Sequence, residues 1–385
     1  MDKFSISLSV PKISGNEWQY IKECLDTEWV SSAGKYVDLF EQKIAKYTGA
    51  KYAVACINGT SALQISLKLA GVLPDDEVIV PTLTFIAPVN AINYNRASPI
   101  FVDSDTYYNI DIEKTIEFIN NKTVYKDGFT FNKNTNKKIS AIIPVHVWGN
   151  AARLDDLIPI CRERNIAIVE DASESLGSFY KEGKYKGMHT GTIGNLGCLS
   201  FNGNKIITSG GGGIILTDNQ KFVEKARYFT TQAKDDPVRY IHNEIGYNFR
   251  LSNIQAALGL AQLEQLPFFL KCKREIYNTY QTMIEPVDGL TFACAPDYAD
   301  NNHWMNLLQI ESEAYGEDRE SLMHRLGENS IQTRPVWGLN HLQKPYRNCQ
   351  NHIIEMAYKL VDISLCMPSS VNMNDSQIQY ILKNL

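Results

Sequence analysis

Short apolar runs alternate with amphipathic stretches between residues 51 and 218, and this alternation limits the fold more than any other feature of the sequence. The apolar runs are rich in Val and Ile: "YAVACI", "EVIVP", "SPIFVD", "SAIIPVH", "IAIVEDA", "CLSFN" and "GGIILTD". Stretches such as "GTSALQISLKLAG", with apolar residues at helical spacing, follow most of them. Continuous apolar strands separated by helices predict an α/β fold with a mostly parallel central sheet between helices.

The alternation weakens after about Pro267. Beyond it we expect helices in "KCKREIYNTYQTMI" and "DRESLMHRLGENS" and strands in "NHWMNLLQIE" and "IQTRPVW". We therefore place a large α/β domain with the N-terminal segment at residues 1–265 and a smaller α+β domain at 266–385. Residues 120–138 are polar and lysine-rich, which predicts a surface excursion in which "FTF" is compatible with a hairpin.

Composition excludes several classes of protein. A net charge of -5 provides neither the basic footprint of a nucleic-acid-binding protein nor a polybasic membrane patch. The eight cysteines are scattered, with no C-x-x-C pair, so neither a metal site nor a redox dithiol is expected. No apolar run approaches the roughly 20 residues of a membrane span, and the first residues do not resemble a signal peptide. We therefore expect a cytoplasmic protein.

Ligands bind parallel sheets where strands end. The polar or aromatic residues just past the predicted strands are Gly59, Thr60, Ser61, Thr84, Phe85, His146, Asp171 and Lys205. Lys205 lies in "SFNGNKIITSGGGG", where the glycines follow the lysine. A nucleotide-binding P-loop has its glycines before the lysine, and no G-x-G-x-x-G follows a strand. Neither a P-loop nor a dinucleotide fingerprint is therefore present.

A lysine amine that condenses with an aldehyde is the alternative chemistry, and it is how pyridoxal phosphate (PLP) is held. The turn Gly59-Thr60-Ser61 at a helix start offers amides and hydroxyls to a phosphate, and Ser200 offers another hydroxyl. Asp171 follows a strand and can pair with a pyridine nitrogen, and Phe85 can stack on the ring. Structural roles stay open: Asp171 as a cap, Thr60 and Ser61 as helix-start residues, Phe85 as core.

These residues lie in stretches that resemble the DegT/DnrJ/EryC1/StrS family, fold type I PLP-dependent aminotransferases of nucleotide-linked keto sugars. The stretches are "NGTSAL", "VPTLTFIA", "PVHVWGN", "EDASESLGS", "SFNGNKIITSGGGG" and "GYNFRLSNIQAALGL". The resemblance implies a Schiff base at Lys205, pyridine pairing at Asp171 and ring stacking at Phe85. It also implies phosphate contacts from Thr60, Ser61 and Ser200, and from Asn248 of a neighbouring subunit, hence a homodimer with shared sites.

One position departs from the commonest family pattern, because Glu174 stands where many members have Gln. A carboxyl beside the cofactor's phenolic oxygen requires either a neutral Glu174 or a proton shared with that oxygen. Members that aminate C4 of a 6-deoxy sugar look similar here, which favours a C4 keto group.

The resemblance implies a nucleotide-linked keto sugar as acceptor and L-glutamate as amino donor, released as 2-oxoglutarate. The segment "NHLQKPY" (340–346) and the lysine-rich insert resemble the legionaminic acid branch, so we expect a UDP-linked 2-acetamido-4-keto-2,6-dideoxyhexose. UDP, GDP and dTDP are not distinguished by the residues themselves. The insert lysines fit a solvated face, or attraction of the nucleotide diphosphate.

Candidate substrate contacts are Trp29, Ser31, His146, Arg250, His303 and Arg334. Each also has a structural interpretation: an entry turn for Trp29 and Ser31, and a satisfied interior histidine for His146. Two rival functions differ in class. A sugar dehydratase of the same fold carries His in place of the lysine, which Lys205 argues against. A regulatory protein on a retained fold would be expected to have lost its cofactor residues.

Overall fold

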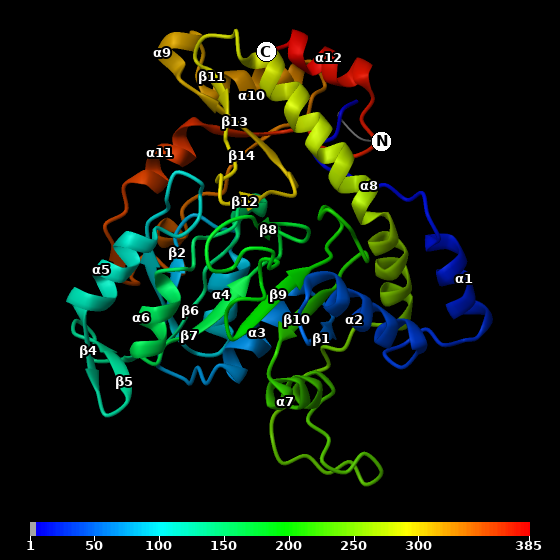
Figure 1. The fold of residues 1–385 in the computed structure, drawn as a ribbon, viewed down its shortest axis with the longest axis vertical. Coiled ribbons are helices and arrows are strands. Elements are labelled where there is room, and N and C mark those ends of the chain that lie inside the picture. Colours follow the sequence, from blue (N-terminus) through cyan, green and yellow to red (C-terminus); the bar gives the residue numbers. More distant parts are fainter. Residues whose placement is uncertain (1–4) are drawn as a thin grey trace.

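The computed structural model describes residues 5–385, so residues 1–4 of the predicted large domain lie outside it. Within these residues ten strands form the main sheet, in the order β1-β10-β9-β7-β6-β2-β3-β15, with the hairpin β4–β5 attached at β6 (Figure 1). β10 is antiparallel to β1 and β9, and the remaining pairs along this order are parallel. The strands are β1 (Tyr52–Cys56), β2 (Glu77–Pro81), β3 (Ser98–Val102), β4 (Thr123–Lys126), β5 (Phe129–Asn132), β6 (Lys138–Ile142), β7 (Ala167–Asp171), β9 (Leu196–Ser200), β10 (Gly213–Thr217) and β15 (Asn351–His352).

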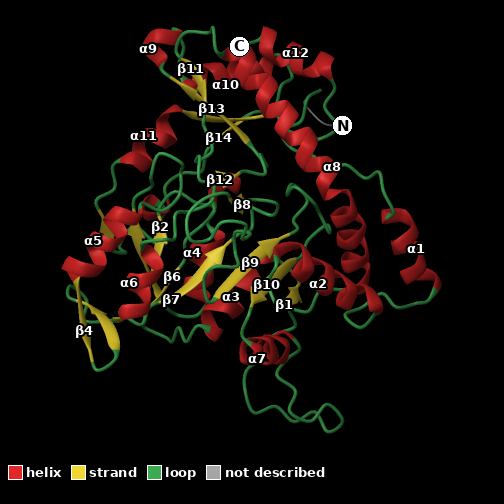
Figure 2. Ribbon diagram, in the orientation of Figure 1, coloured by secondary structure: helices red, strands yellow, loops and turns green. Residues whose placement is uncertain are grey.

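Helices cover both faces of this sheet, as Figure 2 shows. Alternate strand residues enter different cores: Val78 and Val80 of β2 join one cluster, whereas Ile79 between them joins another. α3 and α4 pack on the first face, and α5 and α6 contribute to the cluster on the second. The predicted mostly parallel sheet between helices is thus confirmed. The helices of this part are α1 (Glu17–Asp26), α2 (Lys35–Thr48), α3 (Gly59–Leu69), α4 (Ala87–Tyr94), α5 (Ile112–Lys122), α6 (Leu157–Glu163) and α7 (Gln220–Thr230).

A second, smaller sheet has the order β11-β13-β16-β14 and is antiparallel. It shares its own apolar core with the C-terminal part of α8 and with α10 and α12. Its elements are β11 (Leu290–Phe292), β13 (Asn306–Ile310), α9 (Ser312–Tyr315), α10 (Arg319–Glu328), β14 (Arg334–Pro335), α11 (Met356–Ile363), β16 (Ser364–Met367) and α12 (Asp375–Lys383). A short pair, β8 (Phe179–Tyr180) with β12 (Ala299–Asp300), completes the strands among the described residues.

The long helix α8 (Asn253–Ile284) joins the two parts. Its first half packs on α1 and α2, and its second half packs on β11 and α12. The predicted boundary at 265/266 falls inside this helix, close to Pro267, so the chain passes from one part to the other without a flexible linker. The division into two domains stays a prediction.

Two segments extend from the main body. The lysine-rich insert forms the hairpin β4–β5, the conformation with which "FTF" is compatible. Residues 231–252 form an irregular arm between α7 and α8 that projects below α7 in Figure 1. Within residues 5–385, no helix combines the length and the hydrophobicity that crossing a membrane requires.

Candidate active site

A cavity of about 330 Å³ opens at the carboxyl ends of the sheet strands. Eight of the residues singled out in the sequence line it: Gly59, Thr60, Thr84, Phe85, Asp171, Glu174, Ser200 and Lys205. They come from the start of α3, the loop after β2, the end of β7, and the end and following loop of β9. The parallel strands therefore bring together residues that are as much as 146 positions apart in the sequence, from Gly59 to Lys205.

Lys205 reaches into this cavity from the loop between β9 and β10. Its Nζ lies 3.4 Å from Oε1 of Glu174 and 4.1 Å from the ring centre of Trp304. The amide of Lys205 donates to the carbonyl of Asn202, 3.0 Å away, in a turn that directs the side chain. Among the described residues that line the cavity, Lys205 is the one lysine or arginine. It is therefore the amine available there to an aldehyde.

The turn at the start of α3 forms a polar cradle. The side chain of Asn58 caps the helix by accepting the amide of Ser61 at 2.8 Å. A Cβ at Gly59 would lie 2.9 Å from Cβ of Ser200 and 3.3 Å from Oγ of Ser173, so only a bare backbone fits between these hydroxyls. A helix N-terminus with converging Thr and Ser hydroxyls is a phosphate-binding arrangement, and it fits the PLP phosphate.

The two carboxyl groups of the cavity are both buried. Burial raises the pKa of Asp171, against the opposing effects of Ser173 and the Lys205 ammonium, and the amide of Ser173 donates to its Oδ1 at 3.0 Å. Burial also raises the pKa of Glu174, and Lys205 again opposes the shift. Oε2 of Glu174 accepts the amide of Trp148 at 2.8 Å, from a residue held at φ 51°. Both groups are thus poised to hold a proton or to gain a cationic partner.

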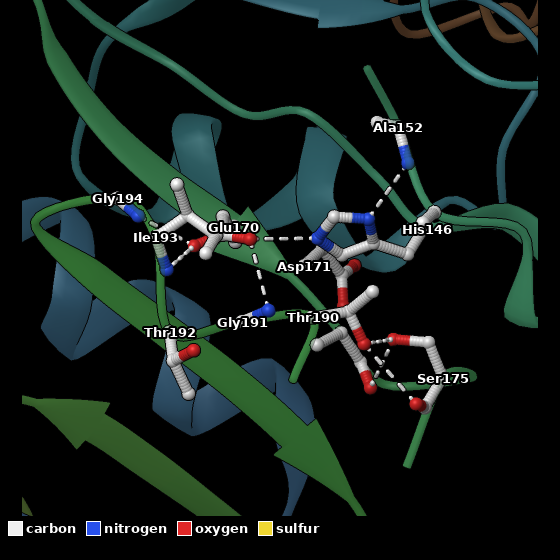
Figure 3. Close-up of polar contacts among 12 residues, drawn as sticks. His146, Ala152, Glu170, Asp171, Ser175, Thr190, Gly191, Thr192, Ile193 and Gly194 are labelled. Carbon is white, nitrogen blue, oxygen red and sulfur yellow. Dashed lines mark hydrogen bonds and ion pairs between the residues drawn. The ribbon is translucent and has the colours of Figure 1, made fainter. Parts of the chain in front are cut away.

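Directly behind Asp171, on the other face of the sheet, Glu170 forms a closed polar cluster (Figure 3). Its Oε2 accepts His146 Nε2–H (2.8 Å) and the amide of Gly191 (2.9 Å). Its Oε1 accepts the amides of Ile193 and Gly194, both at 2.6 Å. Burial alone would raise the pKa of Glu170, but His146 and these amides outweigh burial and hold it below its ordinary value.

This cluster also decides the role of His146. Its Nδ1 accepts the amide of Ala152 at 3.0 Å, so the ring proton is on Nε2, where it is donated to Glu170. The ring is fully buried and does not line the cavity. Of the two interpretations of His146, the structure agrees with that of a satisfied interior histidine, because both ring nitrogens bind groups of the protein interior.

Three further predicted contacts, Ser61, Arg250 and His303, are not part of the cavity lining of this chain. The guanidinium of Arg250 is 2.5 Å from Oε1 of Glu41. The ring of His303 stacks on Tyr277 at 4.3 Å, and burial lowers the pKa of His303 to about 4. Ser61 is buried within α3 and its amide is used by the helix cap. Their roles toward cofactor or substrate stay predictions.

Four other predicted contacts lie on the surface outside the cavity lining: Trp29, Ser31, Arg334 and Asn248. Asn253 donates from its side chain to the carbonyl of Trp29 and from its backbone amide to the carbonyl of Ser31. Trp29 and Ser31 therefore belong to the turn before α2. Asn248 pairs with Thr231 at the base of the arm. Their roles toward ligand stay predictions.

Two tryptophans that the sequence interpretation missed line the cavity. Trp304 follows the predicted His303, and Trp337 lies three residues after the predicted Arg334. Trp337 stacks on Trp148 with ring centres 4.5 Å apart and lies 6.1 Å from the ring of Phe85. In both segments, the residue that lines the cavity is a near neighbour of the predicted one. The missed polar lining residues are Asn58, Ser173, Asn202 and Asn204.

The segment "NHLQKPY" supports the loop that carries Phe85. Asn340 donates from Nδ2 to the carbonyls of Thr82 and Thr84 at 3.2 and 2.7 Å. Nδ1 of His341 lies 2.6 Å from Oγ1 of Thr82. The lysine-rich hairpin contributes no residue to the cavity lining described here. These contacts make 340–346 a support of the aromatic wall.

Comparison with known proteins gives an independent result. The DegT/DnrJ/EryC1/StrS aminotransferase family matches residues 11–385. The chain is 36% identical over 376 residues to a GDP-perosamine synthase of Escherichia coli O157:H7, covering 97% of this chain and 96% of the relative. It is 33% identical over 382 residues to a GDP-perosamine synthase of Caulobacter vibrioides, covering 99% and 97%.

Solved structures show the same fold. The structure of DesI in the presence of its TDP-sugar product superposes with a TM-score of 0.87 at 24% identity, covering 100% of this chain and 92% of DesI. The fold is therefore fold type I, as expected. PLP is the cofactor of this fold and family, and the cradle at Gly59, the amine of Lys205 and the carboxyl of Asp171 fit it. By its sequence over nearly its whole length and by its fold, the chain belongs to the DegT/DnrJ/EryC1/StrS aminotransferase family.

Proposed function

We propose that the protein transfers the amino group of L-glutamate to the C4 keto group of a nucleotide-linked 6-deoxy sugar. The observation that carries this proposal is the convergence of Lys205, Asp171, Glu174 and the Gly59–Thr60 cradle on one cavity. Bound PLP supplies an aldehyde that accepts the amino group from the donor and an electron-withdrawing ring that stabilises charge on the reacting carbon.

The residues divide this work. Lys205 would hold PLP through its amine and, when that amine is free, would move a proton at the reacting carbon. Asp171 keeps the pyridine nitrogen protonated, because its buried carboxylate is stabilised by a cation. Thr60, Ser173 and Ser200 line the cavity and would donate to the phosphate, and Phe85 would stack on the ring.

Glu174 has a separate role in this proposal. Its raised pKa and its 3.4 Å contact with Lys205 favour a carboxyl that shares a proton with the lysine or with the phenolic oxygen of PLP. A glutamine at this position could donate a hydrogen bond but could not exchange a proton. Glu174 therefore gives the site a second proton-holding group beside Lys205.

Two nucleotide sugars are the substrates to compare. The resemblance of residues 340–346 favours a UDP-linked 2-acetamido-4-keto-2,6-dideoxyhexose, of the legionaminic acid branch. Two relatives above 30% identity are named GDP-perosamine synthases, which favours a GDP-linked 4-keto-6-deoxy sugar. Both have the C4 keto group that the proposal requires.

A second copy of the chain completes the site in this proposal. The cavity lining of one chain contains Lys205 as its one cation among the described residues, although two phosphate-bearing ligands must be bound. Asn248 is exposed at the base of the arm, and Val238 and Ile245 on that arm are 81% and 79% exposed. If a second copy of the chain covers these apolar side chains, Asn248 of the first copy would lie near the Gly59–Thr60 cradle of the second.

The test is to incubate the PLP-loaded protein with L-glutamate and each of the two keto sugars, and to analyse the products by mass spectrometry. The proposal predicts 2-oxoglutarate and a sugar in which C=O has become CH–NH2, with Lys205→Ala as the inactive control. A sugar that has lost a hydroxyl group would instead support the dehydratase. No turnover of either sugar, with glutamate deamination intact, would contradict the proposed acceptor.

A further inference from the structure

A lysine occupies a core position on α8. The buried face of its second half consists of Phe269, Lys273, Ile276, Tyr280 and Ile284, which recur every three or four residues. Lys273 is only 2% exposed. Its neighbours on this face are apolar or aromatic, and burying an ammonium costs far more than burying a methylene chain. A lysine on the buried apolar face of a helix therefore needs specific polar partners.

The ammonium of Lys273 binds the ends of two strands of the small sheet. Nζ donates to the carbonyl of Trp304 at 2.9 Å, to Oγ of Ser369 at 3.1 Å, and also to the carbonyl of Ser369. Trp304 stands just before β13, and Ser369 just after β16, which are paired strands. These partners are uncharged, and burial lowers the pKa of Lys273 to about 7.

Trp304 in turn contacts the lysine of the active site in two ways. Its Nε1–H donates to the carbonyl of Asn204, at 2.6 Å, which is the peptide immediately before Lys205. Its ring centre lies 4.1 Å from Nζ of Lys205, which is a cation–π distance. The loop is also tied to the large sheet, because Asn302 accepts the amide of Trp304 and donates to the carbonyls of Glu174 and Leu176.

We propose that Lys273 is a positioning residue that, by holding the backbone of Trp304, keeps the indole ring against Lys205 and aims its amine at the aldehyde of PLP. The proposal rests on the role of Lys205 as the PLP-binding amine. In the step concerned, the ammonium gives a proton to solvent, the amine nitrogen adds to the aldehyde carbon, and one water leaves as the C=N bond forms. The orientation of the Lys205 amine affects the rate of this step, because its nitrogen must approach the aldehyde carbon within a narrow range of directions.

The experiment follows the visible absorption that appears when PLP is added to the full-length protein from which the cofactor has been removed. Four single variants are compared: Trp304→Leu, Trp304→Phe, Lys273→Met and Lys271→Met. Lys271 is an exposed lysine two residues away on the same helix and is the matched control. Circular dichroism and the unfolding midpoint establish that each variant is folded, and Lys273→Gln replaces Lys273→Met if the latter is not.

We expect Trp304→Leu and Lys273→Met each to slow the reaction by about tenfold, because the amine then spends most of its time in orientations from which it cannot reach the aldehyde carbon. Trp304→Phe retains an aromatic ring and should remain within about threefold of the wild type. Lys271→Met should react at the wild-type rate. In the double variant Lys273→Met/Trp304→Leu, the rate should equal that of Trp304→Leu alone, because Lys273 acts through Trp304.

Two results would overturn the positioning role: wild-type rates in Lys273→Met, or a double variant slowed by the product of the two single effects. The second result would mean that Lys273 stabilises the fold independently of Trp304. Failure of the proposed function looks different, because a wild-type protein that forms no band with PLP would contradict the role of Lys205 itself.

Discussion

Glu170 and Asp171 are consecutive on β7, yet the two faces of the sheet give them opposite surroundings. Glu170 receives four donors, from His146 and the amides of Gly191, Ile193 and Gly194, and its pKa is lowered. Asp171 faces the cavity and receives a hydrogen bond from the amide of Ser173, and its pKa is raised. Side chains alternate along a strand, so one residue step separates these environments.

The difference shows how a buried carboxylate can be assigned a role. Glu170 has its charge compensated within the protein, so its interactions are complete without a ligand. Asp171 is buried to the same degree, but Ser173 and the ammonium of Lys205 compensate its charge only in part, so the rest of the compensation has to come with a ligand. We therefore assign Glu170 to stability and Asp171 to function, and the predictions below test this division.

The largest expected effect is at the cavity. Asp171→Asn should lower the transamination rate by roughly 10² to 10³-fold, the loss seen when one preorganised electrostatic contact to a reacting group is removed. Its free energy of unfolding in the absence of PLP should not fall, because burial of this carboxylate is unfavourable. Steady-state kinetics and urea unfolding test the pair of statements. A large loss of stability would mean that Asp171 is a structural residue.

The counterpart on the other face is Glu170→Gln. The side-chain NH2 of the new glutamine would face two of the four N–H donors, which would then lose their acceptor. We therefore expect a loss of about 3 kcal/mol in the free energy of unfolding. The rate per PLP-loaded molecule should stay within about threefold of the wild type, since Glu170 touches no reacting atom. If the rate of folded Glu170→Gln falls as much as that of Asp171→Asn, Glu170 cannot be assigned to stability alone.

Lys273 extends the comparison to pH. Its folded-state pKa of about 7 lies below its unfolded value, so between these values the unfolded chain binds more protons and stability rises with pH. Above pH 7, the free energy of unfolding of the wild type relative to Lys273→Met should rise by about 1.4 kcal/mol per pH unit. Urea unfolding of both proteins at pH 7, 8 and 9 measures this difference, in which other titrating groups cancel. A constant difference would show that the ammonium stays charged.

The smallest expected effect concerns the aromatic wall. Phe85 is 52% exposed and faces Trp337 across the cavity mouth, so replacing it with Leu removes a stacking surface without opening the core. We expect a PLP affinity about three- to tenfold weaker, as for the loss of one aromatic pair. Fluorescence titration of the cofactor-free protein measures it, with Phe129→Leu on the remote hairpin as the control. Equal affinities for both variants would place the stacking elsewhere.

Strand-end residues were predictable because the pattern of apolar runs fixes where parallel strands stop. Gly59, Asp171 and Lys205 meet at one sheet edge for this reason. Trp304 and Trp337 were not predictable, because they enter from loops of the small sheet. Which of two adjacent side chains faces the cavity depends there on tertiary contacts, such as the stacking of His303 on Tyr277.

His146 is a residue that the sequence singles out but that does not line the cavity. Its position after a strand is the same as that of a ligand-binding residue, and the residue type suits either role. Only the contacts with Glu170 and with the amide of Ala152 show that both nitrogens are used internally. Arg250 is comparable, because its partner Glu41 lies 209 positions away in the sequence. The local sequence does not reveal when a polar side chain has its hydrogen-bond partner far away in the chain.

The central claim is that Lys205 holds PLP as an amine that L-glutamate can displace. The most direct measurement is the visible absorption spectrum of the PLP-loaded protein before and after L-glutamate is added without a sugar. The account predicts a long-wavelength band that glutamate bleaches, with equimolar 2-oxoglutarate formed, and no such band in Lys205→Ala without the donor. A wild-type spectrum that is unchanged by glutamate, or a Lys205→Ala protein with the wild-type band, would contradict it.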